Sequence, residues 1–83
     1  SMPTIMEQLI QDAEARGEAR ARARIQEQAR DDFVNDIVSL ISDMHLSVSK
    51  SIAVLDSLGW SDEDKNKLIS RLEQIGYIEN LHD

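Results

Sequence analysis

Apolar or small residues recur at every fourth position between Ile5 and Ile41. The positions are Ile5, Leu9, Ala13, Gly17, Ala21, Ile25, Ala29, Phe33, Ile37 and Ile41. Residues four apart lie on neighbouring turns of one helix face, and the stretch contains no proline. The pattern predicts one long helix over residues 4–44, with Thr4 as its N-cap and Glu7 completing a capping box.

The stripe formed by these residues does not run straight along the helix. An α-helix has about 3.6 residues per turn, so each step of four rotates the stripe by roughly 40°, and nine steps carry it about once round the helix. We therefore expect the two halves of the helix to face different neighbours, and a two-stranded coiled coil over the whole length is disfavoured. Met6 and Ile10 widen the first half of the stripe, and Val34, Val38 and Leu40 widen the second.

Two shorter helices are predicted after the long one. Ser47 is expected to cap the first, and Gly59 to end it in a left-handed conformation, with Trp60 packing back on the helix. Ser61 and Asp64 form a second capping box at the start of the last helix. The fold class is therefore all-α, with one long N-terminal helix followed by two short antiparallel helices that associate as a helical oligomer.

The predicted core draws on apolar residues from all three helices. The expected inward residues are Phe33, Val34, Ile37, Val38, Leu40, Ile41, Met44, Val48, Ile52, Leu55, Leu58, Leu68, Ile69, Leu72 and Ile75, with Tyr77, Ile78 and Leu81 packing back as a short tail. The chain divides into a tag remnant and N-terminal extension (residues 1–3), an oligomerisation helix (residues 4–44) and a small helical C-terminal unit (residues 45–83).

Self-association is expected because the chain is short. At 83 residues, with no cysteine, it has little surface to cover a long helix and no disulfide or thiolate metal site to stabilise it. The expected partner-binding residues are Ile5, Met6, Leu9, Ile10, Ala13, Gly17, Ala21 and Ile25, together with Arg20, Arg22 and Arg24. An antiparallel pair is preferred, because acidic Glu7, Asp12 and Glu14 of one chain would then lie near these arginines of the other.

Charge divides unevenly along the chain. The net charge of −7 disfavours nucleic acid as the main partner, yet residues 16–30 hold five arginines against two glutamates and are locally +3. Part of this band can be neutralised within the helix by three pairs at i,i+3 or i,i+4. Three interpretations of this basic band stay open: a solvated helix face, a surface for an acidic protein or a second copy, and a nucleic-acid contact.

The sequence contains no constellation of catalytic residues. No nucleophile, base and orienting group are brought together by spacing, so the chain is expected not to be an enzyme and to hold no cofactor. The two imidazoles, His45 and His82, lie far apart and without cysteines, so no metal site is expected, and His45 is interpreted as complementing a helix dipole. No apolar run is long enough to span a bilayer, which suggests a cytoplasmic protein with no membrane partner.

The order of these features resembles the C-terminal region of the recombination-promoting nucleases, bacterial proteins of the PD-(D/E)XK type. The resemblance rests on the charged helix of residues 14–20, the apolar helix end of residues 37–44, the helix start at Leu46-Ser47 and the run Leu58-Gly-Trp-Ser-Asp-Glu-Asp64. It covers most of the chain. In that family a glycine commonly stands where this chain has His45, and the penultimate helix is shorter.

The resemblance implies a regulatory function. The nuclease's catalytic residues would lie in an N-terminal domain absent from this sequence, and the tail would oligomerise the nuclease. Made separately, for which Met2 would suit as the start, it would bind the full-length protein as an inhibitor or antitoxin. The hypothesis is a non-catalytic module that binds itself and the matching region of a larger nuclease. The alternative is a nucleic-acid accessory segment that uses Arg16–Arg30.

Overall fold

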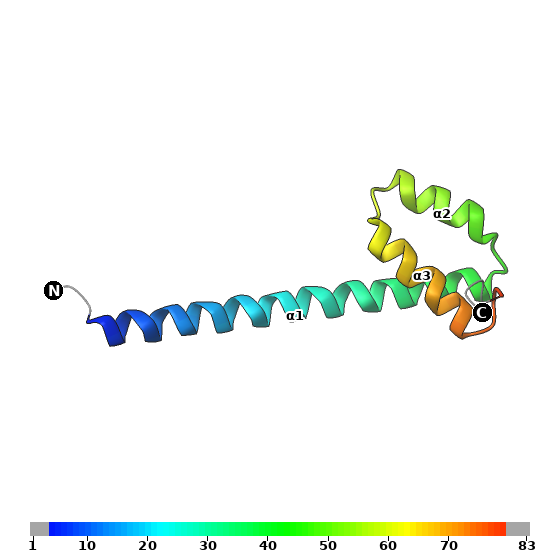
Figure 1. Cartoon of the computed structure of the whole chain (residues 1–83). Helices are drawn as coiled ribbons and strands as arrows, with labels where there is room; N and C mark the ends of the chain where they lie inside the picture. Colours follow the sequence, from blue (N-terminus) through cyan, green and yellow to red (C-terminus); the bar gives the residue numbers. More distant parts are fainter. Residues whose placement is uncertain (1–3, 80–83) are drawn as a thin grey trace. The chain divides into compact units, whose positions relative to one another are not determined.

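The computed structural model describes residues 4–79, which form three α-helices and no strand (Figure 1). The helices are α1 (Ile5–Asp43), α2 (Val48–Ser57) and α3 (Asp62–Gln74). This result confirms the all-α prediction and the three predicted helices. The expected tag remnant at residues 1–3, and the predictions for Leu81 and His82, lie outside the described residues.

Each helix begins at a hydroxyl side chain that accepts a hydrogen bond from a backbone N–H three residues further on. This bond satisfies one of the donors that the first turn leaves without a helical partner, and it confirms the predicted N-caps. The pairs are Thr4 with Glu7 (3.1 Å), Ser47 with Lys50 (3.3 Å) and Ser61 with Asp64 (3.1 Å).

All three helices end in the same type of turn. A residue with positive φ follows the last helical turn: His45 (55°), Gly59 (86°) or Gly76 (76°). The N–H of the next residue then donates back to the carbonyl five positions earlier, which is the bond that defines a Schellman motif. The three bonds are Leu46 to Ile41 (2.9 Å), Trp60 to Leu55 (3.1 Å) and Tyr77 to Leu72 (2.9 Å).

The chain forms two units, Ser1–Arg30 and Asp31–Asp83, and their boundary falls inside α1. The division predicted at residue 45 separates an oligomerisation helix from a C-terminal unit by function, and it stays a prediction. In the first unit, residues 5–30 are helical and no described residue is buried. In the second unit, residues 31–43 of α1 supply half of the buried core.

The core of the second unit is small. It consists of Val34, Val38, Ile41, Leu55, Leu68 and Leu72, with half-buried Ile37, Leu46, Val48, Ile52, Trp60, Tyr77 and Ile78 packed around it. Within this unit α2 and α3 run in opposite directions (Figure 1), as predicted. The Tyr77 hydroxyl donates to the carbonyl oxygen of Leu46 at 2.6 Å, which ties the segment after α3 to the turn after α1.

Five residues that were expected in the core are exposed. They are Phe33, Leu40, Met44, Leu58 and Ile75, each with about half or more of its surface accessible. The prediction was wrong because each of the three helices is covered by the other two on one side only. The buried residues of α1 follow the spacing Val34, Val38, Ile41, and the neighbouring row on the same helix remains outside.

His45 adopts a conformation that is strained for a residue with a side chain. Its φ of 55° lies in the left-handed region, where the Cβ crowds the following carbonyl at a cost of about 1–2 kcal/mol. The earlier interpretation, a residue that complements the helix dipole, does not account for this conformation. His45 occupies the position that glycine holds after α2 and α3.

Replacing His45 with glycine is therefore expected to stabilise the second unit. Removing the strain stabilises the folded state by more than the added conformational entropy of glycine stabilises the unfolded state. The free energy of unfolding therefore rises by about 0.5–1 kcal/mol, and the Tm rises by about 3–6 °C. Thermal unfolding followed by circular dichroism measures the change. As a control, Ser42→Gly, inside α1, should lower stability by about 0.5 kcal/mol. An unchanged or lower Tm for His45→Gly would contradict the strain.

Candidate functional site

The first turns of α1 carry large apolar side chains that are exposed. Ile5 is 82% exposed, Met6 64%, Leu9 54% and Ile10 50%, and we call these four residues the N-terminal patch. They occupy adjacent positions on two successive helix turns, so they form one continuous apolar surface. Exposed apolar surface of this kind on a protein is typical of an interaction site.

The other predicted partner-binding residues continue along α1. Ala13 and Ile25 are exposed, whereas Gly17 and Ala21 are half-exposed. A methyl group added at Gly17 would meet only the end of the Arg20 side chain, at 4.0 Å. No contact within the described chain therefore requires a glycine at this position.

Four of the five arginines of the basic band lie on one side of the helix. Arg20, Arg22 and Arg24 are exposed, and they follow one another at intervals of two residues. Residues four apart share a helix face, so Arg16, Arg20 and Arg24 lie within about 80° of one another, with Arg30 beside them, whereas Arg22 points to nearly the opposite side of α1. A ligand lying along that side of the helix would therefore face every arginine of the band except Arg22.

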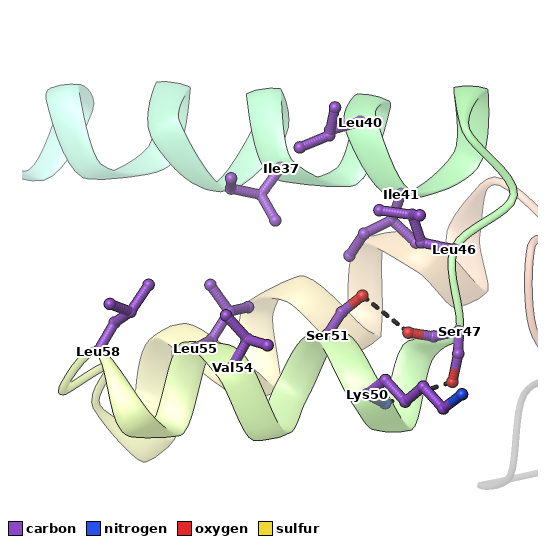
Figure 2. A pocket seen from close by; sticks show the side chains of 10 residues that line it. All are labelled: Ile37, Leu40, Ile41, Leu46, Ser47, Lys50, Ser51, Val54, Leu55 and Leu58. Atoms are coloured by element: carbon purple, nitrogen blue, oxygen red, sulfur yellow. Dashed lines mark hydrogen bonds between the residues drawn. The ribbon is translucent and has the colours of Figure 1, made fainter.

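A second apolar surface lies within the second unit, between the end of α1 and α2. Figure 2 shows this groove, which has a volume of about 390 Å³. Seven of its ten lining residues are apolar, and three of these, Leu40, Val54 and Leu58, are exposed. We call it the α1–α2 groove, and its lining consists of Ile37, Leu40, Ile41, Leu46, Ser47, Lys50, Ser51, Val54, Leu55 and Leu58.

The polar residues of the α1–α2 groove lie at its end nearest the turn between the two helices (Figure 2). The Ser51 hydroxyl donates to the carbonyl oxygen of Ser47 at 2.7 Å, and the Ser47 hydroxyl caps α2. Both serines are thus engaged by their own helix. Lys50 is different, because it forms no ion pair with any residue in the described part of the chain.

Asp31 joins α1 to α3. Arg71 donates to the Asp31 side chain at 3.2 Å and to its backbone carbonyl at 3.1 Å, and the Lys67 ammonium lies 3.3 Å from the same carboxylate. The hydrogen bond from Arg71, followed by that from Lys67, lowers the pKa of Asp31 below its ordinary value of 3.8. This cluster therefore holds α3 against the part of α1 that belongs to the second unit.

Lys65 makes a similar connection between α3 and α2. Its ammonium lies 2.7 Å from Asp56 and 3.2 Å from Asp62. The hydrogen bond to Lys65 lowers the pKa of Asp56, and the bond to Asp56, followed by that to Asp62, raises the pKa of Lys65 above 10.5. These pairs therefore contribute their full stabilisation between about pH 4 and pH 10.

Neither a metal site nor a membrane span is found in residues 4–79. No group of three or more His, Cys, Asp or Glu side chains among them is arranged to hold a metal ion. None of the three helices combines the length and the apolar character that crossing a bilayer requires. Comparisons of the chain with protein-family models, with curated proteins and with solved structures give no match.

The sequence pattern did not reveal the groove or the Asp31 cluster. Leu40, Val54 and Leu58 carry the apolar signal of core residues, and only the packing of α1 on α2 shows that they line an open surface. Arg71 lies forty residues from Asp31, so spacing along a helix could not pair them. A row of apolar residues adjacent to the buried one was the available signal for the groove.

Asp31→Asn tests the contribution of this cluster through its pH dependence. Because folding lowers the pKa of Asp31, its stabilisation is present above pH 3.8 and is lost as the pH falls through the lowered value. We expect the variant to have a lower Tm than the unmodified chain at pH 7, with the difference disappearing near pH 2. Asp36→Asn, on an exposed position of the same helix, serves as the control. A Tm difference that persists unchanged at pH 2 would contradict this explanation.

Proposed function

We propose that this chain is a non-catalytic oligomerisation module that associates with copies of itself through the first unit of α1. The observation that supports the proposal is the N-terminal patch, where four adjacent large apolar side chains are each at least half exposed. Leaving such side chains in water costs about 1.5–3 kcal/mol each relative to full burial. A partner that covers the patch recovers much of this free energy.

The second half of the proposal concerns a larger partner. The resemblance to the C-terminal region of the recombination-promoting nucleases suggests that the chain binds the matching region of such a nuclease and regulates it, as an inhibitor or antitoxin. The same patch would serve both contacts, because the nuclease tail would carry the equivalent helix. A cytoplasmic location would follow from such a partner.

The balance of charge in the first unit favours protein association over the nucleic-acid alternative. A phosphate backbone is best bound by a surplus of cations, whereas residues 1–30 hold five arginines and five acidic residues and are neutral as a whole. Arginines interspersed with acids suit pairing with the opposite charges of a neighbouring chain.

Introducing charge into the N-terminal patch should dissociate the assembly. We expect the double variant Leu9→Asp, Ile10→Asp to bind itself at least about 100-fold more weakly, because both carboxylates would need to be desolvated in the interface. Analytical ultracentrifugation over a concentration series measures the change.

The control for this experiment is Gln11→Asp, Ala15→Asp, which adds two aspartates to exposed positions outside the patch. It should assemble like the unmodified chain, and both variants should keep their helical circular dichroism. A monomeric unmodified chain, or equal masses for the two variants, would refute the proposed interface.

Mixing the chain with a full-length recombination-promoting nuclease tests the regulatory half. We expect a mixed complex on size-exclusion chromatography with light scattering, and slower DNA cleavage as the chain is added in excess. The Leu9→Asp, Ile10→Asp variant should do neither. Cleavage that stays unchanged while the mixed complex forms would leave an assembly role but reject the inhibitory one.

A further inference from the structure

The α1–α2 groove has the form of a helix-binding site. Its two walls are helices, and each contributes exposed apolar side chains: Leu40 from α1, and Val54 and Leu58 from α2 (Figure 2). Grooves of this kind accept the apolar face of an amphipathic helix, whose anchoring residues occur at positions i, i+3, i+4 and i+7. The groove's occupant should therefore be a helix with four such anchors.

We propose that the α1–α2 groove of one copy binds residues 5–13 of α1 from a second copy. This inference rests on the proposed self-association and names the surface that receives the N-terminal patch. Met6, Leu9, Ile10 and Ala13 stand at positions i, i+3, i+4 and i+7. They belong to a regular part of α1, so the segment is already helical before it binds and loses little conformational entropy.

The distribution of charge favours this occupant over a second groove. Residues 1–30 contain five arginines and five acidic residues and are neutral, so the whole net charge of −7 belongs to residues 31–83. Packing groove against groove would bring two units of −7 together, and like charges across an interface oppose association. Docking a neutral segment on the acidic unit avoids this repulsion.

The single cation at the rim of the groove adds a specific complement. Lys50 lines the groove and has no acidic partner among the described residues, whereas the other two lysines and Arg71 are paired within the second unit. The docking segment carries Glu7, an exposed acid one position from Met6. An ion pair between Glu7 and Lys50 of the other copy would set the direction in which the segment lies.

The contact can be made twice in a closed dimer. In a dimer with twofold symmetry, whatever one copy contributes to the other it also receives, so each copy supplies one segment and one groove. The N-terminal patch and the groove walls are then both covered by a single kind of contact. Each copy then uses its patch and its groove within the pair, so neither of these two surfaces is left to recruit further copies in an open chain.

Disulfide trapping between two single-cysteine variants tests the docking. The chain contains no cysteine, so Met6→Cys in one preparation and Val54→Cys in another introduce unique thiols. After mixing under mild oxidation, we expect the disulfide-linked heterodimer to exceed either homodimer at least about fivefold, because only the mixed pair is brought within bonding distance. Because the two thiols are on different chains, a mixed disulfide reports a contact between copies.

Ala15→Cys replaces Met6→Cys in the control mixture, since Ala15 is exposed on α1 but outside the patch. This mixture should give no excess of heterodimer. A dominant Val54→Cys homodimer would show groove-to-groove packing, and a dominant Met6→Cys homodimer would show pairing of the N-terminal patches. Either outcome overturns the proposal.

Leu58→Asp separates this inference from the proposed function. Leu58 is 71% exposed, so its replacement should leave the fold intact while weakening self-association about tenfold or more. If Leu9→Asp, Ile10→Asp dissociates the assembly and Leu58→Asp does not, the groove is refuted and the association stands. If the unmodified chain is monomeric, both fail together.

Discussion

The second unit depends on how its helices end. At each end the backbone turns through a left-handed residue, and the hydrophobic residue that follows packs back on the core: Leu46, Trp60 and Tyr77. The backbone hydrogen bond of each turn goes to Ile41, Leu55 or Leu72, and all three are buried core residues. The turns thus fix the direction of the next segment and cover part of the core at once. A core of six residues buries little apolar surface. The three half-buried side chains that the turns place around it therefore provide much of its cover.

The small number of helices also explains the exposed apolar surface. A three-helix unit buries one row of side chains from each helix, and α1 has a second row beside the buried one. With only α2 and α3 available, Phe33 and Leu40 stay about half exposed, although the centre of the Phe33 ring lies 5.6 Å from that of Trp60. Each helix starts at a capping residue and ends in a regular turn, so the extra exposed apolar surface is not a sign of a poorly specified fold. It consists of apolar residues that the packing within one chain leaves uncovered.

Much of the fold was predictable from the sequence, because it is encoded locally. The capping residues Thr4, Ser47 and Ser61 and the glycine turn at Gly59 lie within a few residues of the bonds they make, and all were predicted. The core was only partly predictable. Leu68 and Ile75 have the same apolar signal, and their burial differs because Ile75 is the last residue before the turn at Gly76. The groove and the bonds of Asp31 depend on residues far apart in the chain, which periodicity does not relate.

Charge then decides which kind of contact the second unit can make. Most of its few cations form ion pairs within the unit. Lys65 pairs with Asp56 and Asp62, and both Arg71 and Lys67 pair with Asp31. The remaining surface is acidic and repels another copy of the same unit at low ionic strength. Apolar attraction therefore favours a partner surface that adds little negative charge, and the neutral residues 1–30 of the chain meet this condition. Added salt should screen the repulsion between acidic units while leaving apolar burial intact, so an association of this type gains little from low salt, unlike one built on the arginine band.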